Sequence, residues 1–286
     1  MSGARLRVTV LGCGGSAGVP QIGGPDGRGD WGACDPADPR NRRTRSSIVL
    51  EAGIVLEAGV LEANGQGRLL VDTGPDLRAQ LLACAVPRID ALLFTHAHAD
   101  HLVGLDEVRI LNRILGAPMP AAMFAHTLDE IARRFDYVMQ PRDDRWDRPG
   151  RPPVFARPVL DLRTVVSGQN ITLAGHQITV FEQDHGFSRT LGLRCGAFAY
   201  STDAVALDPA AMAILEGVDT WLVGCFQRGS HRTHANLDQV IAWADQLRPR
   251  RTILTHMGFD LDHGWLRANL PPGIEPAHDG MVIETG

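Results

Sequence analysis

Four side chains of the kind that bind metal ions lie within six residues, about one third of the way along the chain. The stretch Ala91–His101 reads ALLFTHAHADH, so an apolar run leads directly into His96, His98, Asp100 and His101. Imidazole nitrogens and carboxylate oxygens suit zinc, manganese or iron. Alternation in an extended segment directs His96 and His98 to the same side. The cluster therefore predicts a metal site, and a polar loop that merely collects histidines is the alternative.

Three more candidate ligands each follow the end of an apolar run in the second half of the chain. They are His185, Asp203 and His256. The carboxyl ends of neighbouring strands in an open α/β sheet meet at one edge, where ligands bind as a rule. Each residue alone is a weak signal, because single histidines are often structural. Together with the cluster, they provide enough ligands for two metal ions.

Short β-branched runs alternate with amphipathic stretches, which predicts a layered α/β structure. The predicted strands are Leu6–Leu11, Ser47–Glu51, Leu69–Asp72, Ala91–Phe94, Ile178–Glu182, Ala197–Ser201, Thr220–Val223 and Thr252–Leu254. The predicted helices are Asp76–Cys84, Leu105–Leu115, Leu128–Tyr137, Pro209–Leu215 and Leu237–Leu247. Asp208 before Pro209 is expected to cap one helix, and Asn236 is expected to cap the next.

Two segments differ from this alternation. Residues 48–53 and 54–59 are the same hexapeptide, IVLEAG, and 60–65 is the near copy VLEANG. Three short copies are too few for a solenoid, so a lengthened β-hairpin is the prediction. The segment Gln140–Pro158 is rich in arginine, aspartate and proline. Because proline breaks both helices and central strands, we expect a long loop there.

Composition excludes several classes of function. The net charge of −5 argues against a protein that coats nucleic acid or anionic membrane. Every basic side chain is arginine, which excludes lysine-dependent Schiff-base and P-loop chemistry. The scattered cysteines, the lack of an apolar leader and the lack of a bilayer-length apolar run predict a cytoplasmic protein. No linker-like break is evident, so we expect a single domain over residues 1–286.

The order of these motifs resembles the metallo-β-lactamase superfamily. The pattern H-x-H-x-D-H after a strand, followed by His, Asp and His at later strand ends, extends over nearly the whole chain. The segments LGCGGSAGVPQIGG at 11–24, NRRTRSS at 41–47, VDTGP at 71–75 and residues 255–259 resemble the branch containing phosphoribosyl 1,2-cyclic phosphate phosphodiesterase. The resemblance implies a four-layer αββα sandwich and a hydrolase with two divalent ions, zinc or manganese.

The resemblance also implies a role for each candidate residue. One metal would be bound by His96, His98 and His185. The other would be bound by Asp100, His101 and His256, with Asp203 bridging the two. Asp72 would orient a ligand by hydrogen bonding. His234, in HRTHANLDQ, matches a histidine that contacts the phosphate or protonates the leaving oxygen, and a surface or helix-capping role is the alternative.

These roles imply hydrolysis of a small cyclic or nucleotide-like phosphodiester through a metal-bridging hydroxide, with a small phosphorylated molecule as the substrate. Phosphate contacts are one interpretation of the nearby arginines Arg42, Arg43 and Arg45, and a solvated basic turn is the other. The remaining histidines match no ligand position and are interpreted as structural or surface residues. They are His126, His176, His231, His263 and His278.

The sequence also departs from the resembled branch. An additional structural zinc there is held by clustered cysteines and a histidine, but here only Cys34 is present in the first region and Phe259 replaces the histidine. One cysteine cannot complete a tetrahedral site, so we expect no such zinc.

Four other functions stay open. They are a tRNA 3′-end endonuclease, a pyrroloquinoline-quinone biosynthesis accessory protein, a lactam or thioester hydrolase, and a non-enzymatic metal-dependent binding protein. We expect no stable nucleic acid and no membrane partner, because the chain is acidic and has no basic RNA-gripping arm. The oligomeric state stays open, a homodimer included.

Overall fold

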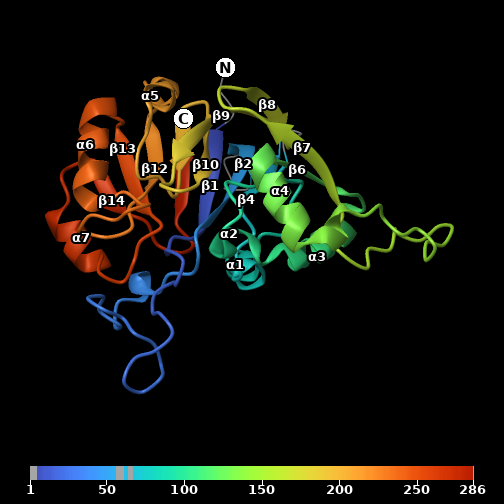
Figure 1. The fold of residues 1–286 in the computed structure, drawn as a ribbon, viewed down its shortest axis with the longest axis horizontal. Coiled ribbons are helices and arrows are strands. Elements are labelled where there is room, and N and C mark those ends of the chain that lie inside the picture. Colours follow the sequence, from blue (N-terminus) through green and yellow to red (C-terminus); the bar gives the residue numbers. More distant parts are fainter. Residues whose placement is uncertain (1–4, 56–60, 64–66, 286) are drawn as a thin grey trace.

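The computed structural model describes residues 5–55, 61–63 and 67–285, which form two facing β-sheets covered by helices. Helices α1–α4 lie on the side of the first sheet, and helices α5–α7 lie on the side of the second (Figure 1). This arrangement confirms the predicted α/β fold with four layers in the order αββα.

The first sheet is built from strands within residues 5–165 and from the final strand. Its order is β15-β1-β2-β4-β5-β6-β7, and β3 pairs with β2. The strands are β1 (Arg5–Gly12), β2 (Ser47–Val55), β3 (Leu61–Ala63), β4 (Leu69–Val71), β5 (Ala91–Leu93), β6 (Met119–Phe124), β7 (Leu160–Val165) and β15 (Val282–Thr285). Strands β4 to β7 run parallel to one another, so their carboxyl ends share one edge.

The second sheet is built from the remaining strands, in the order β14-β13-β12-β11-β10-β9-β8. They are β8 (Asn170–Leu173), β9 (His176–Asp184), β10 (Arg189–Cys195), β11 (Phe198–Ser201), β12 (Thr220–Gly224), β13 (Arg251–Thr255) and β14 (Ile274–Pro276). Strands β11 to β14 are parallel, whereas β8, β9 and β10 form an antiparallel meander.

Seven α-helices are described in the covered ranges of the chain, and local capping explains where two of them begin. They are α1 (Leu77–Ala83), α2 (Ala99–Leu102), α3 (Val108–Leu115), α4 (Ala125–Arg134), α5 (Pro209–Leu215), α6 (Leu237–Leu247) and α7 (His263–Asn269). The Asp208 side chain accepts from the Ala211 amide at the start of α5, as predicted. Asn236 and Gln239 form a reciprocal capping box at the start of α6.

Side chains that alternate along the strands of the first sheet divide between two apolar cores. Leu69 and Val71 of β4 face the core between the sheets, whereas Leu70 faces the core under helices α1, α3 and α4. Leu93 and Leu92 of β5 divide in the same way. Because a strand directs successive side chains to opposite faces, both faces of this sheet are dry at β4 and β5. The strand ends that carry the candidate ligands are therefore held on both sides.

Most predicted strands and helices are present with shifted ends. The predicted helix Leu128–Tyr137 begins earlier, at Ala125, and ends at Arg134 before a separate 3-10 turn over Asp136–Met139. The predicted helix at Leu105 begins as a 3-10 turn and becomes α3 at Val108. The sequence did not predict β6, β7, β8, β10, β14, β15, α2 and α7. Several of these are short or carry proline and alanine, so their patterns are weak.

The two unusual segments behave as predicted where they are described. Strands β2 and β3 pair antiparallel through residues of the repeated hexapeptides, which agrees with a lengthened hairpin. Residues 56–60 and 64–66 of the repeats lie outside the described residues. The segment 140–158 contains no helix or strand and projects from the body of the protein (Figure 1). An Arg142–Asp147 ion pair and an Arg145–Asp143 ion pair lie within it, so two of its five arginines are balanced locally.

Candidate metal centre

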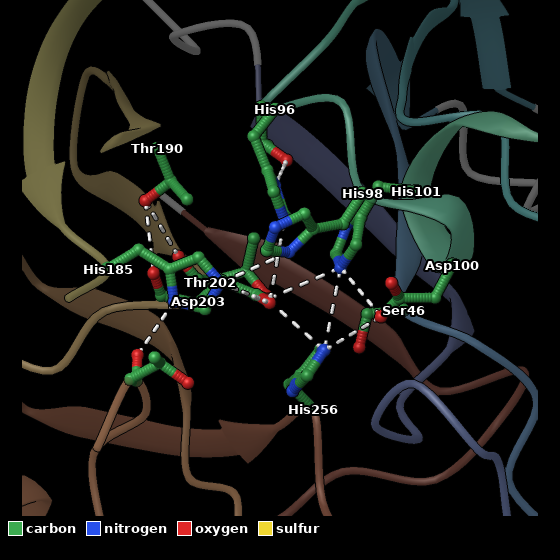
Figure 2. Close-up of polar contacts among 12 residues, drawn as sticks. Ser46, His96, His98, Asp100, His101, His185, Thr190, Thr202, Asp203 and His256 are labelled. Carbon is green, nitrogen blue, oxygen red and sulfur yellow. Dashed lines mark hydrogen bonds and ion pairs between the residues drawn. The ribbon is translucent and has the colours of Figure 1, made fainter. Parts of the chain in front are cut away.

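All seven predicted ligands converge where the carboxyl ends of strands from both sheets meet. They are His96, His98, Asp100, His101, His185, Asp203 and His256. Most follow directly from the ends of β5, β9, β11 and β13, or lie in the short helix α2. Figure 2 shows these side chains pointing toward one another from opposite sides of a common space. Their donor atoms form two groups that share Asp203.

The first group contains His96, His98, His185 and Asp203, with donor atoms within 4.8 Å of one another. Nδ1 of His98 lies 3.2 Å from Nε2 of His185. Asp203 Oδ2 lies 3.7 Å from Nε2 of His96 and 3.7 Å from Nε2 of His185. His98 is half-buried, whereas the other three residues are buried. The group is therefore open to solvent on the side of His98.

The second group contains Asp100, His101, Asp203 and His256, all of them buried. Nε2 of His101 lies 3.3 Å from Asp100 Oδ2, 3.3 Å from Asp203 Oδ1 and 3.5 Å from Nε2 of His256. Nε2 of His256 lies 3.4 Å from Asp100 Oδ2 and 3.2 Å from Asp203 Oδ1. Four ligands at the usual zinc distances in a tetrahedron are about 3.3–3.5 Å from one another. The donor spacing of this group fits such a metal.

The Asp203 carboxylate divides its oxygens between the two groups. Oδ1 faces His101 and His256, and Oδ2 faces His96 and His185. Burial raises the pKa of this carboxyl, but the neighbouring imidazoles outweigh burial and hold the pKa well below its usual value. The carboxylate is therefore ionised and can face a cation on each side.

The chemistry of the donors also fits a cation. Nε2 of His96 is buried and has no hydrogen-bond partner in the part of the chain that the structure describes. Burial, reinforced by His101, lowers the pKa of His96 well below its usual value. Its Nδ1 lies 3.0 Å from Thr95 Oγ1, and this hydroxyl donates to Asp72, so the proton of the ring belongs on Nδ1. The lone pair of Nε2 then faces an anionic carboxylate, an arrangement that a metal ion between them would stabilise.

Hydrogen bonds from behind fix the orientation of the His101 and His185 rings, whereas the buried Nδ1 of His256 has no partner among the described residues. Nδ1 of His101 donates to Asp72 Oδ2 at 2.7 Å, so its Nε2 faces the centre. The Thr95 amide donates to the other Asp72 oxygen at 2.7 Å. Nδ1 of His185 donates to the Thr233 carbonyl at 2.7 Å. Such partners hold metal-binding imidazoles in one tautomer. Asp72 thus makes the kind of contact that the sequence analysis expected, and Thr95 and Thr233 are partners that it missed.

Three residues of the centre have a left-handed backbone. The φ angles are 66° at Asp72, 51° at Asp203 and 51° at His256. Such a conformation is uncommon outside glycine and is maintained only where the surroundings impose it. Each of these residues comes directly or almost directly after a buried parallel strand. The sharp turn directs the side chain across the strand ends instead of along the sheet.

His234 lies at the edge of the centre. Its Nδ1 is 3.7 Å from Asp203 Oδ2, and its ring stacks between the rings of Phe226 and His256, with centroids 4.8 Å and 4.9 Å away. Burial, together with the nearby imidazoles, lowers the pKa of His234 to about 3. The ring is therefore neutral near pH 7 when no substrate anion is bound. Phe226, which the sequence analysis did not single out, fixes the plane of this ring.

The arginine turn does not form a phosphate site as a unit. Arg43 is buried, and its guanidinium donates to the carbonyls of Gly258 and Leu261 at 3.0 and 2.6 Å. Both interpretations of the turn, as a phosphate contact and as a solvated basic segment, are therefore wrong for this residue. Arg45 forms an ion pair with Asp76 at 3.0 Å. The guanidinium of Arg42 lies 5.0 Å from the centre of the Trp31 ring. These arginines stabilise loops around the centre.

Two histidines that the sequence analysis interpreted as structural or surface residues border the centre. The ring centroids of His231 and His234 are 5.0 Å apart. His126 lines a cavity together with His96 and His98. No spacing signal connects either residue with the ligand motif, because His126 lies on helix α4 and His231 lies in a loop before α6.

Cys34 lies outside both donor groups. Its thiol donates to the Phe259 carbonyl at 3.4 Å, and burial raises the pKa of the thiol. The expected lack of a structural zinc at this residue stays a prediction.

Among the described residues, no helix has the length and apolar character needed to cross a membrane.

Comparison with known proteins places this geometry in a family. The model of the β-lactamase superfamily domain matches residues 67–257. A solved structure of a diphosphatase from the PhnP family is 33% identical, with 98% of this chain and 97% of the other covered and a TM-score of 0.81. Zinc-bound PqqB from Methylobacterium extorquens is 19% identical over 98% of this chain and 100% of its own, with a TM-score of 0.71. This second likeness shows the fold alone.

A curated relative from Porphyromonas gingivalis (strain ATCC BAA-308 / W83), an octanoyltransferase, is 28% identical over 282 residues. The match covers 96% of this chain and 51% of that protein, so this chain spans about half the length of the relative. The family model, in contrast, covers most of the chain and includes the seven clustered side chains. The His/Asp cluster of the chain could hold metal ions. The chain therefore belongs to the β-lactamase superfamily and is a hydrolase of the metallo-β-lactamase fold.

Proposed function

We propose that this protein is a phosphodiesterase that uses two divalent ions, zinc or manganese, to hydrolyse a small cyclic or nucleotide-like phosphodiester. The observation that carries the proposal is the division of the Asp203 oxygens between two donor groups. A site built for two adjacent cations suits in-line displacement at a phosphorus atom. The 33% identity to a diphosphatase of the PhnP family supports phosphorus chemistry over lactam or thioester hydrolysis.

The residues of the chain would act in distinct ways around the reacting phosphate. When bound, the two ions would supply an activated water and positive charge for the phosphoryl oxygens. Asp203 would bind both ions and so hold the two donor groups together. Asp72 would hold His101 in the tautomer whose Nε2 can bind a metal ion. His234, beside Asp203, is the candidate proton donor to the leaving oxygen. An approaching phosphate anion would raise its low pKa, because a nearby negative charge favours imidazolium.

A hydrolysis screen of the metal-loaded protein tests the reaction class. We expect turnover of cyclic phosphodiesters, linear nucleotide diesters or bis(p-nitrophenyl) phosphate, and no turnover of β-lactams and thioesters. Cleavage of a thioester or lactam without cleavage of any diester would refute the proposed substrate class and leave the fold and the donor groups unaffected.

The variant His234→Ala tests the role of the candidate acid. With an unactivated ester we expect kcat to fall by about 10²–10⁴-fold, the usual effect of removing a positioned proton donor. Metal content measured on the same sample should not change. A p-nitrophenolate leaving group needs no proton, so it should largely rescue the variant. An equal loss with activated and unactivated esters would show that His234 is a binding contact and not an acid.

We further propose that residues 1–286 act as one cytoplasmic domain on a free small molecule, without a stable nucleic-acid or membrane partner. The core between the two sheets, which includes side chains of both, supports one folding unit. Calorimetry should then give a single unfolding transition, and light scattering should distinguish a monomer from a homodimer. Two separable transitions would contradict the single domain.

A further inference from the structure

A cavity of about 580 Å³ opens beside the first donor group. Its floor contains His96 and His98, so anything bound in it would lie next to the metal ligands. One wall is a face of helix α4 that extends from His126 to Arg134, and the other is the tight turn between β9 and β10 that follows His185. The cavity is thus a natural extension of the reaction site for a further part of the substrate.

The turn between β9 and β10 carries an aromatic ring into solvent. Phe187 is 85% exposed, although it is an apolar side chain. Its ring centroid lies 6.4 Å from that of His185, which belongs to the first donor group. An exposed ring of this kind gains free energy when a flat partner covers it. Its position at the mouth of the cavity provides one face for such a partner.

The opposite wall offers hydrogen-bonding groups. Thr127 is fully buried and lines the cavity, and its Oγ1 has no hydrogen-bond partner in the described ranges of the chain. Buried hydroxyls without a partner are costly and uncommon, so a ligand atom that bonds to Thr127 would remove this cost. His126 lies next to it and contacts the Arg189 carbonyl at 3.3 Å.

Each arginine around the cavity has a carboxylate partner, although two of them share one carboxylate. Arg134 pairs with Glu130 at 2.8 Å, and Arg133 pairs with the same carboxylate. Arg189 pairs with Asp184 at 2.7 Å. Because these guanidiniums already have carboxylate partners, the cavity does not favour a second phosphate. It favours an uncharged planar group with polar edges.

We propose that this cavity binds the nucleobase of the phosphodiester, with Phe187 stacking on the base and Thr127 hydrogen-bonding to its edge. The inference rests on the proposed function, which places the phosphate at the donor groups. It assigns Phe187 and Thr127 as specificity-determining residues and makes nucleotides, not simple sugar phosphates, the preferred substrates. Stacking of a base on an aromatic side chain tolerates any base, so the preference is for a base as such.

The test compares a nucleoside 3′,5′-cyclic monophosphate with the same cyclic diester of ribose that lacks the base. In Phe187→Ala, we expect the ratio of kcat/KM for the two substrates to fall by about 5- to 100-fold, mainly through KM. Thr127→Val keeps the shape of the side chain and should lower the ratio by about 2- to 10-fold. Phe187→Trp should retain the preference. Trp146→Ala, which removes an aromatic side chain that is 67% exposed on the 140–158 loop, is the matched control.

A binding measurement separates this inference from the proposed reaction. Calorimetry with adenosine 5′-monophosphate and with ribose 5-phosphate should show tighter binding of the nucleotide by the wild type and a reduced difference in Phe187→Ala. If no diester were cleaved but this difference were observed, the proposed reaction would be wrong and the base site would stand. If diesters were cleaved but Phe187→Ala affected both substrates equally, the base site would be refuted.

Discussion

The two donor groups of the metal centre share Asp203 but differ in how completely the protein encloses them. The second group is entirely buried, and its donor atoms are 3.2–3.5 Å apart along the measured pairs. The first group has distances of up to 3.7 Å and includes the half-buried His98, which lines the substrate-sized cavity. If each group holds an ion, as proposed, the second group would be the rigid anchor and the first the more open position.

The contacts behind one histidine of each group, His101 and His185, differ in the same direction. His101 of the second group donates to a buried carboxylate, Asp72, which also accepts from the amide and hydroxyl of Thr95. His185 of the first group donates only to a backbone carbonyl. A carboxylate partner increases the basicity of an imidazole more than a carbonyl does, which strengthens its bond to a metal ion. The second group should therefore bind its ion more tightly.

The largest effect is expected for the residue that both groups share. Asp203→Ala removes one carboxylate oxygen from each group and the single negative charge that they share, so turnover should fall by at least about 10³-fold, since the ions stabilise the transition state by several kcal/mol. Metal analysis should show fewer than two ions per chain. Asp203→Asn keeps the shape without the charge and should be nearly as impaired. Two ions per chain in Asp203→Ala would show that this residue does not bridge.

Removing one ligand from each group tests the asymmetry directly. His256→Ala should weaken the most tightly held ion by at least about 10²-fold, because one of its four donors is lost. His98→Ala should instead lower the occupancy of the weaker ion and leave the tight one in place. Titration against a chelator resolves both constants. The opposite pattern would assign the rigid anchor to the first group.

A smaller effect is expected behind the ligands. Asp72→Asn has the same shape but cannot hold the His101 ring as strongly, so metal affinity should fall by about 10- to 100-fold. Thr95→Val removes the hydroxyl that connects Asp72 with His96 and should have a weaker effect on both ions. Unchanged metal affinity in Asp72→Asn, measured in the same titration, would indicate that this carboxylate serves folding alone.

The smallest effect concerns a buried histidine outside both groups. Burial and the nearby Arg40 lower the pKa of His263 to about 4, against about 6.5 in an unfolded chain. The unfolded state therefore binds a proton that the folded state excludes, and stability is complete above pH 6.5 and is lost as the pH falls toward 4. His263→Gln should make the unfolding free energy of the metal-free protein less dependent on pH in this window. The number of protons taken up on unfolding should fall by up to one. Denaturant titrations at several pH values measure this slope, and an unchanged slope would show that His263 titrates normally.

The clustering of the candidate ligands was predictable because their signal is local or lies at strand ends. His96, His98, Asp100 and His101 stand together in the sequence, and His185, Asp203 and His256 each follow an apolar run. Parallel strands bring such ends together, so the pattern of strands is enough to group them. The sequence-based assignment to two groups agrees with the distances around Asp203.

The surroundings of the ligands were not predictable from the same signals. The bond from His185 to the Thr233 carbonyl involves the backbone, which any residue supplies. The buried position of Arg43 depends on loop carbonyls at Gly258 and Leu261, more than 200 residues away. The cavity under Phe187 depends on how α4 packs beside a turn between two strands. Such features arise from tertiary packing and leave no periodic pattern in the sequence.

Anomalous X-ray diffraction from crystals of the zinc-loaded protein tests the central claim most directly. The account predicts two strong peaks about 3.5–4 Å apart, one within each donor group and with the Asp203 carboxylate between them. The peak in the second group should be the more fully occupied at limiting zinc. A single peak at saturating zinc, or peaks that lie outside these residues, would contradict the dinuclear centre.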